Sequence, residues 1–86
     1  MEQFQHTVQN PEGIHARPAG LLAKQAQKYQ SSIVIAKQTG KQADLKRLIA
    51  VMGLSVKQGE TVTLTIDGAD EQTAAQELKA FMEANF

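Results

Sequence analysis

The segment TVTLTID, residues 61–67, alternates strictly between polar and aliphatic side chains. Successive side chains of an extended strand point in opposite directions, so Val62, Leu64 and Ile66 share one face and the threonines share the other. The segment QFQHTVQ, residues 3–9, alternates in the same way, with phenylalanine, histidine and valine on its apolar side. Two such segments predict a sheet with one face against a core and the other face in water.

The pattern between these two segments changes from strand to helix and back. A helical stripe of small and apolar residues begins at Ala16, and a run rich in β-branched residues follows at 31–37. A turn then lets 41–44 pair back as a short strand, 45–54 contains a short helix, and a last helix follows with Asp70 as its N-cap. The order β-α-β-β-α-β-α predicts an α+β fold, in which three helices cover one face of a four-stranded antiparallel sheet.

Length and charge narrow the classes of protein that the chain can belong to. Its 86 residues predict a single domain spanning residues 1–86. Nine basic and nine acidic side chains balance, so nothing attracts nucleic acid over a long range. The absence of cysteine excludes disulfides and thiolate metal sites, and no apolar run reaches membrane length. We therefore expect a cytoplasmic protein with no membrane insertion and no nucleic-acid partner.

The segment GIHARPAG, residues 13–20, concentrates reactive groups at the start of the first predicted helix. His15 directly precedes that helix, and the backbone N–H groups of Ala16 and Arg17 have no acceptor within it. With the helix dipole, these N–H groups form a small anion site. Arg17 adds a permanent cation that can bind phosphate through two parallel hydrogen bonds, and Pro18 stiffens the first turn. The segment therefore predicts a phosphate-binding position beside a histidine.

A histidine ring of ordinary pKa, about 6.5, is largely neutral at pH 7 and keeps one nitrogen free as a nucleophile. His15 therefore fits a residue that accepts a phosphoryl group. The alternative is that His15 is an ordinary polar surface residue, because the sequence shows no acid–base partner for it. His6, the other histidine, lies on the apolar side of its strand and is interpreted as structural. Two histidines without supporting carboxylates predict no metal site, and we expect no cofactor.

GIHARPAG resembles the active-site segment of the histidine-containing phosphocarrier family (HPr) of the bacterial phosphoenolpyruvate-dependent sugar phosphotransferase system. The resemblance continues through GKQADLKRLIAVMGL and GADEQTAAQELKAFM. It implies an open-faced β-sandwich, and it implies that phosphorylated enzyme I transfers a phosphoryl group to Nδ1 of His15, beside Arg17. The carrier then passes the group to an enzyme IIA. We expect a monomeric, stoichiometric carrier rather than a stand-alone enzyme.

The middle helix is apolar on two sides. Leu48, Ile49 and Met52 fall in one angular sector, and an alanine, a valine and a leucine fall in another. A short helix cannot bury both sectors against one sheet, so one sector is expected to stay exposed and to mark a partner site. The alternative is that loops shield both sectors. The resemblance implies that enzyme I and enzyme IIA dock on this region. The expected docking residues are Gly20, Lys24, Leu48, Ile49 and Met52.

Two residues depart from the pattern of the family. Arg47 aligns with a serine that is phosphorylated in many Gram-positive relatives, so that regulatory switch is expected to be absent. Glu12 stands where the family usually has a small polar residue. A carboxylate within about 4 Å of the His15 ring would stabilise its protonated form by roughly 1 kcal/mol in a wet site. We hypothesise that Glu12, unless it points into solvent, favours the protonated ring, repels the phosphoryl group and shortens the lifetime of phospho-His15.

Two other functions compete with the carrier. One is a regulatory module of the same fold, which acts in nitrogen or carbon control by binding proteins. The intact histidine disfavours a module that transfers nothing. The other is a small nucleic-acid-binding domain, which the zero net charge and the lack of paired aromatic residues on a central strand disfavour. The sequence leaves open which sugar or which enzyme IIA a carrier would serve.

Overall fold

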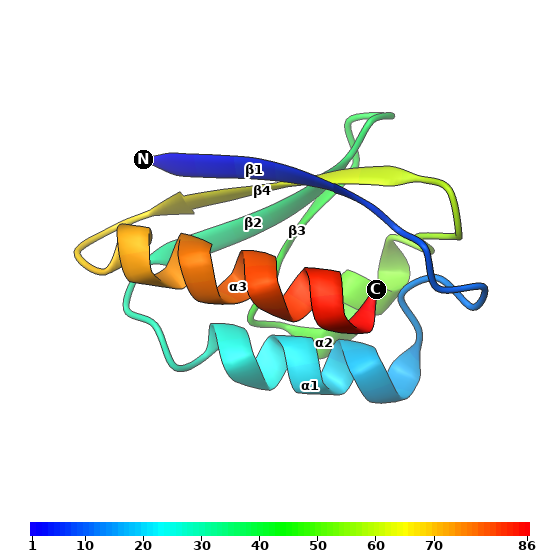
Figure 1. Ribbon diagram of the computed structural model, residues 1–86, viewed down its shortest axis with the longest axis horizontal. Helices are drawn as coiled ribbons and strands as arrows, with labels where there is room; N and C mark the ends of the chain where they lie inside the picture. Colours follow the sequence, from blue (N-terminus) through cyan, green and yellow to red (C-terminus); the bar gives the residue numbers. More distant parts are fainter.

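A computed structural model describes residues 1–86 and confirms the predicted order of elements. The ends of several elements differ from the predicted ones by a few residues. The elements are β1 (Glu2–Thr7), α1 (Ala16–Ala26), β2 (Ser32–Lys37), β3 (Gln42–Asp44), α2 (Leu48–Gly53), β4 (Thr61–Asp67) and α3 (Glu71–Asn85). The three helices lie on one side of the sheet (Figure 1). The α+β fold with one covered face is therefore confirmed.

The four strands form one antiparallel sheet in the order β1-β4-β2-β3. The last strand in sequence therefore lies between the first two, and Leu64 faces Phe4 on one side and Ile35 on the other. The aliphatic row of β4 is fully buried against the helices, together with Leu22 of α1 and Leu78 of α3. The alternation of 61–67 thus determines which face of the sheet carries the core.

The opposite face of the sheet is a polar surface. The Gln3 side chain donates to the Thr65 hydroxyl at 3.1 Å, and the Thr7 and Thr61 hydroxyls lie 2.9 Å apart. These cross-strand pairs keep β1 in register with β4 without adding apolar contacts. The uncharged polar row explains how this face stays in water while the other face is dry.

Asp70 occupies the N-cap position of α3, as predicted, but its carboxylate does not cap the helix. It accepts hydrogen bonds from the backbone N–H groups of Gln30 and Ser31, each at 2.9 Å, and from the Ser31 hydroxyl. The connection from α1 to β2 is therefore joined to the start of α3, across 39 residues of sequence. The Ser31 hydroxyl and the two N–H groups hold the pKa of Asp70 below its ordinary value.

Lys37, at the end of β2, holds the end of α2 in place. Its ammonium group donates to the carbonyl of Leu54 at 3.0 Å and lies 3.1 Å from the Glu60 carboxylate. Only 12% of the side chain is exposed. A cation beside the last carbonyl groups of a helix satisfies acceptors that have no partner within the helix. Lys37 thereby fixes α2 over the sheet, with Val51 and Leu54 in the core.

Replacing Asp70 with asparagine is expected to destabilise the protein at pH 7. The folded-state pKa of Asp70 lies below its ordinary value of 3.8, so the contribution of its charge is present above that pH. It is lost as the pH falls through the folded-state pKa. Thermal unfolding of wild type and Asp70→Asn should therefore differ at pH 7 and converge in strong acid. Asp67→Asn is the matched control, and a gap of constant size at every pH would contradict this role.

Candidate functional site

The loop that carries the histidine makes its turn through backbone contacts. Glu12 N–H donates to the Asn10 side chain at 3.0 Å, and Gly13 N–H donates to the Asn10 carbonyl at 2.9 Å. Ile14 N–H then donates to the Val56 carbonyl at 3.1 Å. Gly13 has a φ of 68°, and a Cβ atom there would lie 2.2 Å from the Val56 oxygen. Only glycine fits both the left-handed backbone and the close approach.

The same loop is also held from α3. Phe86, which follows that helix, is buried, and its backbone oxygen accepts hydrogen bonds from the N–H groups of Gln9 and Asn10. The loop is thus fixed at two points, one beside α3 and one beside the segment that follows α2. His15, which follows this loop, therefore has a defined position relative to α2 and α3.

His15 is the N-cap residue of α1, and its side chain makes no cap hydrogen bond. Its carbonyl oxygen accepts from Ala19 N–H at 2.8 Å, which begins the helix. The N–H groups of Ala16 and Arg17 therefore remain free for an external acceptor, and the first turn holds no acidic side chain. The two donors of the predicted anion site are thus unpaired in the structure, and anion binding there stays a prediction. The Arg17 side chain is exposed and makes no ion pair.

The His15 side chain is 36% exposed, so the ring is reachable from solvent while part of it is packed. An oxygen of the Glu12 carboxylate lies 3.2 Å from Nε2 of this ring. The sequence left open whether Glu12 reaches the ring, and the structure places its carboxylate within contact distance of Nε2. The contact is with Nε2 and leaves Nδ1 on the other side of the ring.

Polar contacts at the end of α1 determine where α2 lies. The Gln27 side chain donates to the Lys46 carbonyl at 2.8 Å, and the Lys46 ammonium donates to the Tyr29 carbonyl at 2.8 Å. Helix α2 therefore begins near the end of α1. The segment after α2 reaches Val56, which contacts Ile14 near the start of α1. The two helices consequently run side by side in opposite directions, and α2 extends toward the histidine loop.

Helix α2 exposes one of its two apolar sectors, as predicted. Leu48 is 36% exposed, Ile49 82% and Met52 40%, whereas Val51 and Leu54 are buried. We call Leu48, Ile49 and Met52 the exposed apolar patch. The alternative in which loops cover both sectors is wrong.

The other expected docking residues lie on the neighbouring helix. Gly20 is half-buried and Lys24 is exposed on α1. Leu21, which was not among the predicted docking residues, is 52% exposed. The sequence feature that could have indicated this exposed residue is a leucine outside the inner stripe of α1, on a face that is otherwise polar. α1 and α2 contact each other, so Leu21 and Lys24 belong to the helix beside the exposed apolar patch.

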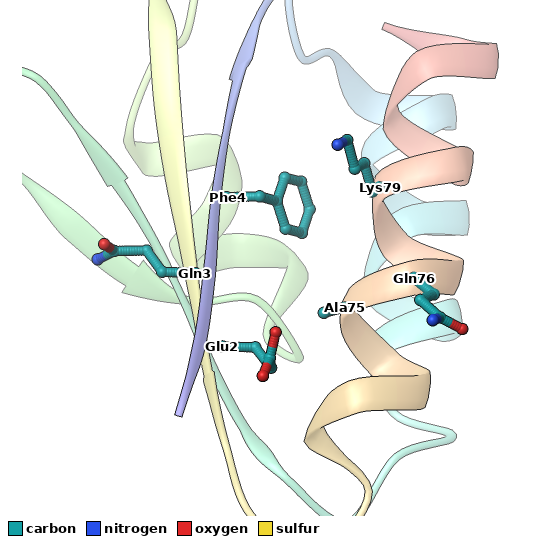
Figure 2. A pocket seen from close by; sticks show the side chains of 6 residues that line it. All are labelled: Glu2, Gln3, Phe4, Ala75, Gln76 and Lys79. Carbon is teal, nitrogen blue, oxygen red and sulfur yellow. The ribbon is translucent and has the colours of Figure 1, made fainter.

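A pocket lies between β1 and α3, at the end of β1 away from the histidine loop (Figures 1 and 2). Phe4 projects into the space toward the helix, while Gln3 points away from it. The lining residues are Glu2, Gln3, Phe4, Ala75, Gln76 and Lys79.

The structure contains no cluster of three or more histidine, cysteine or acidic side chains suited to a metal ion. None of its helices is both long enough and apolar enough to cross a bilayer.

The fold and the site together define a small protein that presents one histidine at a helix N-terminus. Residues 2–84 match the family model of the PTS HPr component phosphorylation site. The phosphocarrier protein HPr of Mycoplasma genitalium is 38% identical over 85 residues, which cover 99% of this chain and 97% of that protein. The chain belongs to the HPr family of phosphocarrier proteins. The family membership that the sequence resemblance predicted is thereby confirmed.

The chain is also similar to solved structures of HPr proteins and to an HPr-like protein called Crh. HPr-C-His from Thermoanaerobacter tengcongensis superposes with a TM-score of 0.92 at 35% identity, covering 100% of this chain and 96% of that one. Another structure of HPr from the same organism is described as a dimer. The HPr-like protein Crh of Halalkalibacterium halodurans is 39% identical over 83 residues, covering 96% of this chain and 98% of that protein. The family thus includes both HPr and Crh proteins.

Replacing Gly13 with alanine is expected to destabilise the fold by about 1–3 kcal/mol, because a left-handed backbone and a close contact are both disturbed. Gly40→Ala is the matched control, since Gly40 has a φ of 97° and a Cβ atom there would meet no other atom within 4 Å. Urea unfolding of both variants measures the difference. The Gly13 variant should lose more stability than the control. Equal losses would show that the contact with Val56 contributes nothing.

Proposed function

We propose that this chain accepts a phosphoryl group from phosphorylated enzyme I on Nδ1 of His15 and passes it to the enzyme IIA of a sugar transporter. The observation that carries the proposal is the half-exposed ring of His15 at the free N-terminus of α1. The Nδ1 lone pair attacks phosphorus while the bond from phosphorus to the donor nitrogen breaks. In the second transfer His15 is the leaving group. The chain is a stoichiometric intermediate in this scheme.

Arg17 and the start of α1 would stabilise the charge of the transferred group. A phosphoryl group on His15 brings two negative charges to a helix end that lacks acidic side chains. The free N–H groups of Ala16 and Arg17 can donate to its oxygens, and the Arg17 guanidinium can pair with two of them. Because the two backbone N–H groups are fixed by the helix before transfer, they need little reorganisation.

The exposed apolar patch is the proposed docking surface for enzyme I and enzyme IIA. Both partners must reach the same histidine in turn, so each interface is expected to be small, at or below about 1,200 Å². Ile49 would be the central contact, because most of its side chain is in solvent. Gly20 and Lys24 would flank it on α1. This relay requires only one copy of the chain, and we propose a cytoplasmic monomer.

A regulatory module acting by protein–protein binding is the second candidate, because Crh proteins are among the relatives. Two residues favour the carrier instead. His15 is present and accessible, which a module that transfers nothing would not need. Arg47 is exposed and lacks a hydroxyl group, and by the resemblance it aligns with the regulatory serine of Gram-positive relatives.

The carrier proposal predicts one added phosphoryl group when the protein is incubated with enzyme I, magnesium and phosphoenolpyruvate. The group should be acid-labile and visible by intact mass. His15→Ala should abolish it, because the nucleophile is removed. His6→Asn is the matched control and should be phosphorylated like the wild type. An unmodified, folded wild-type protein with a competent enzyme I would overturn the proposal and favour the regulatory module.

Docking through the patch predicts that Ile49→Thr weakens the interaction with enzyme I. Truncating a central contact of a protein interface costs on the order of 1–2 kcal/mol, or about five- to thirtyfold in kcat/KM. Val34→Thr also replaces a β-branched aliphatic residue with threonine, on the opposite face of the sheet, and should leave the rate unchanged. Steady-state phosphotransfer with varied carrier concentration measures both. Similar rates for the two variants would show that the exposed apolar patch is not part of the docking surface.

A further inference from the structure

The His15 ring has an acidic neighbour on one side only. Glu12 Oε2 lies 3.2 Å from Nε2, and the ring makes no cap hydrogen bond to α1. The contact is an ion-pair contact: an ionised carboxylate has no proton to give, and its negative charge favours a proton on the ring nitrogen that it faces. In histidine, the partner of one nitrogen sets which nitrogen carries the proton. Glu12 thus favours the form with a proton on Nε2 and a free lone pair on Nδ1.

We propose that Glu12 is a positioning residue that keeps a proton on Nε2 of His15 throughout the phosphoryl-transfer cycle. This inference rests on the proposed function. Its first half concerns the free protein, where the pair keeps Nδ1 nucleophilic. Its second half concerns phospho-His15, where the same pair keeps the ring protonated.

The proton does not move when His15 accepts the group. The Nδ1 lone pair forms the new bond to phosphorus, and the electrons of the donor's nitrogen–phosphorus bond return to the donor. The His15 ring, which still carries the Nε2 proton, becomes a cation. The negative charge of Glu12 beside Nε2 compensates that positive charge.

The same proton matters more when His15 gives the group away. The Nδ1–phosphorus bond breaks and its electron pair returns to Nδ1. With Nε2 protonated, the ring leaves as neutral imidazole. Without that proton it would have to leave as an imidazolate anion, which is a far poorer leaving group. By holding the proton, Glu12 makes phospho-His15 a more reactive donor, both to an acceptor protein and to water.

The Glu12 side chain can be changed without disturbing the loop. The turn uses only its backbone N–H, which donates to Asn10, and 70% of the side chain is exposed. Glu12→Gln keeps the shape and removes the charge, and Glu12→Ala removes both. Glu2→Gln is the matched control, because it makes the same change at the far end of β1 (Figure 1). All of these variants are expected to fold.

The first measurement is the ring ¹⁵N spectrum of His15 in the unphosphorylated protein at about pH 8, where an ordinary histidine is neutral. The fraction of rings with the proton on Nδ1 should rise about two- to fivefold in Glu12→Gln and Glu12→Ala, the size expected for an exposed ion pair. Glu2→Gln should match the wild type. An unchanged fraction in both Glu12 variants would overturn the proposal.

The second measurement is the lifetime of phospho-His15 after removal of enzyme I, followed by intact mass. Hydrolysis should be about two- to fivefold slower in the Glu12 variants than in wild type and Glu2→Gln. Equal lifetimes would overturn the proposal, and so would slower hydrolysis with an unchanged proton position, which would indicate simple repulsion of the phosphoryl group. If enzyme I does not phosphorylate the wild type, the proposed function fails, and the ¹⁵N spectrum alone decides the role of Glu12.

Discussion

Strand β4 is hydrogen-bonded along both edges, to β1 on one side and to β2 on the other. Its buried row of Val62, Leu64 and Ile66 therefore runs through the middle of the sheet and forms the surface on which the helices pack. Burying three aliphatic side chains contributes on the order of 5–8 kcal/mol before chain entropy is subtracted. The position of α1, and with it the position of His15, depends on this row.

Much of this arrangement could be predicted because it depends on local periodicity. A two-residue period in 61–67 determines which side of the strand is dry, whatever that side packs against. The two sectors of α2 follow from the angle between successive helical residues, and a six-residue helix over a sheet can bury only one of them. The free donors at Ala16 and Arg17 follow from the N–H groups that every helix leaves without an acceptor at its start.

What the sequence did not reveal depends on contacts between distant segments. The position of Asp70 indicated an N-cap, yet its carboxylate accepts a hydrogen bond from Ser31, 39 residues away in the sequence. A pattern read over neighbouring residues cannot predict a contact at that separation. For Glu12, the sequence left open whether the carboxylate reaches the ring or points into solvent, because that depends on how the loop turns at Gly13. Leu21 was missed because helical periodicity identifies the buried face of a helix and says nothing about an apolar residue on the exposed face.

Lys37 has a consequence for how the α2 region can be observed in solution. Its ammonium group is held by the Leu54 carbonyl and by Glu60, and little of the side chain is exposed. An amine-reactive reagent can reach it fully only when these contacts separate, whereas Lys24 and other exposed lysines react at all times. The rate at which Lys37 is acylated, relative to its neighbours, therefore reports how often the end of α2 lifts from the sheet. Lys37 is therefore a built-in chemical probe for the opening of α2, the helix that carries Ile49.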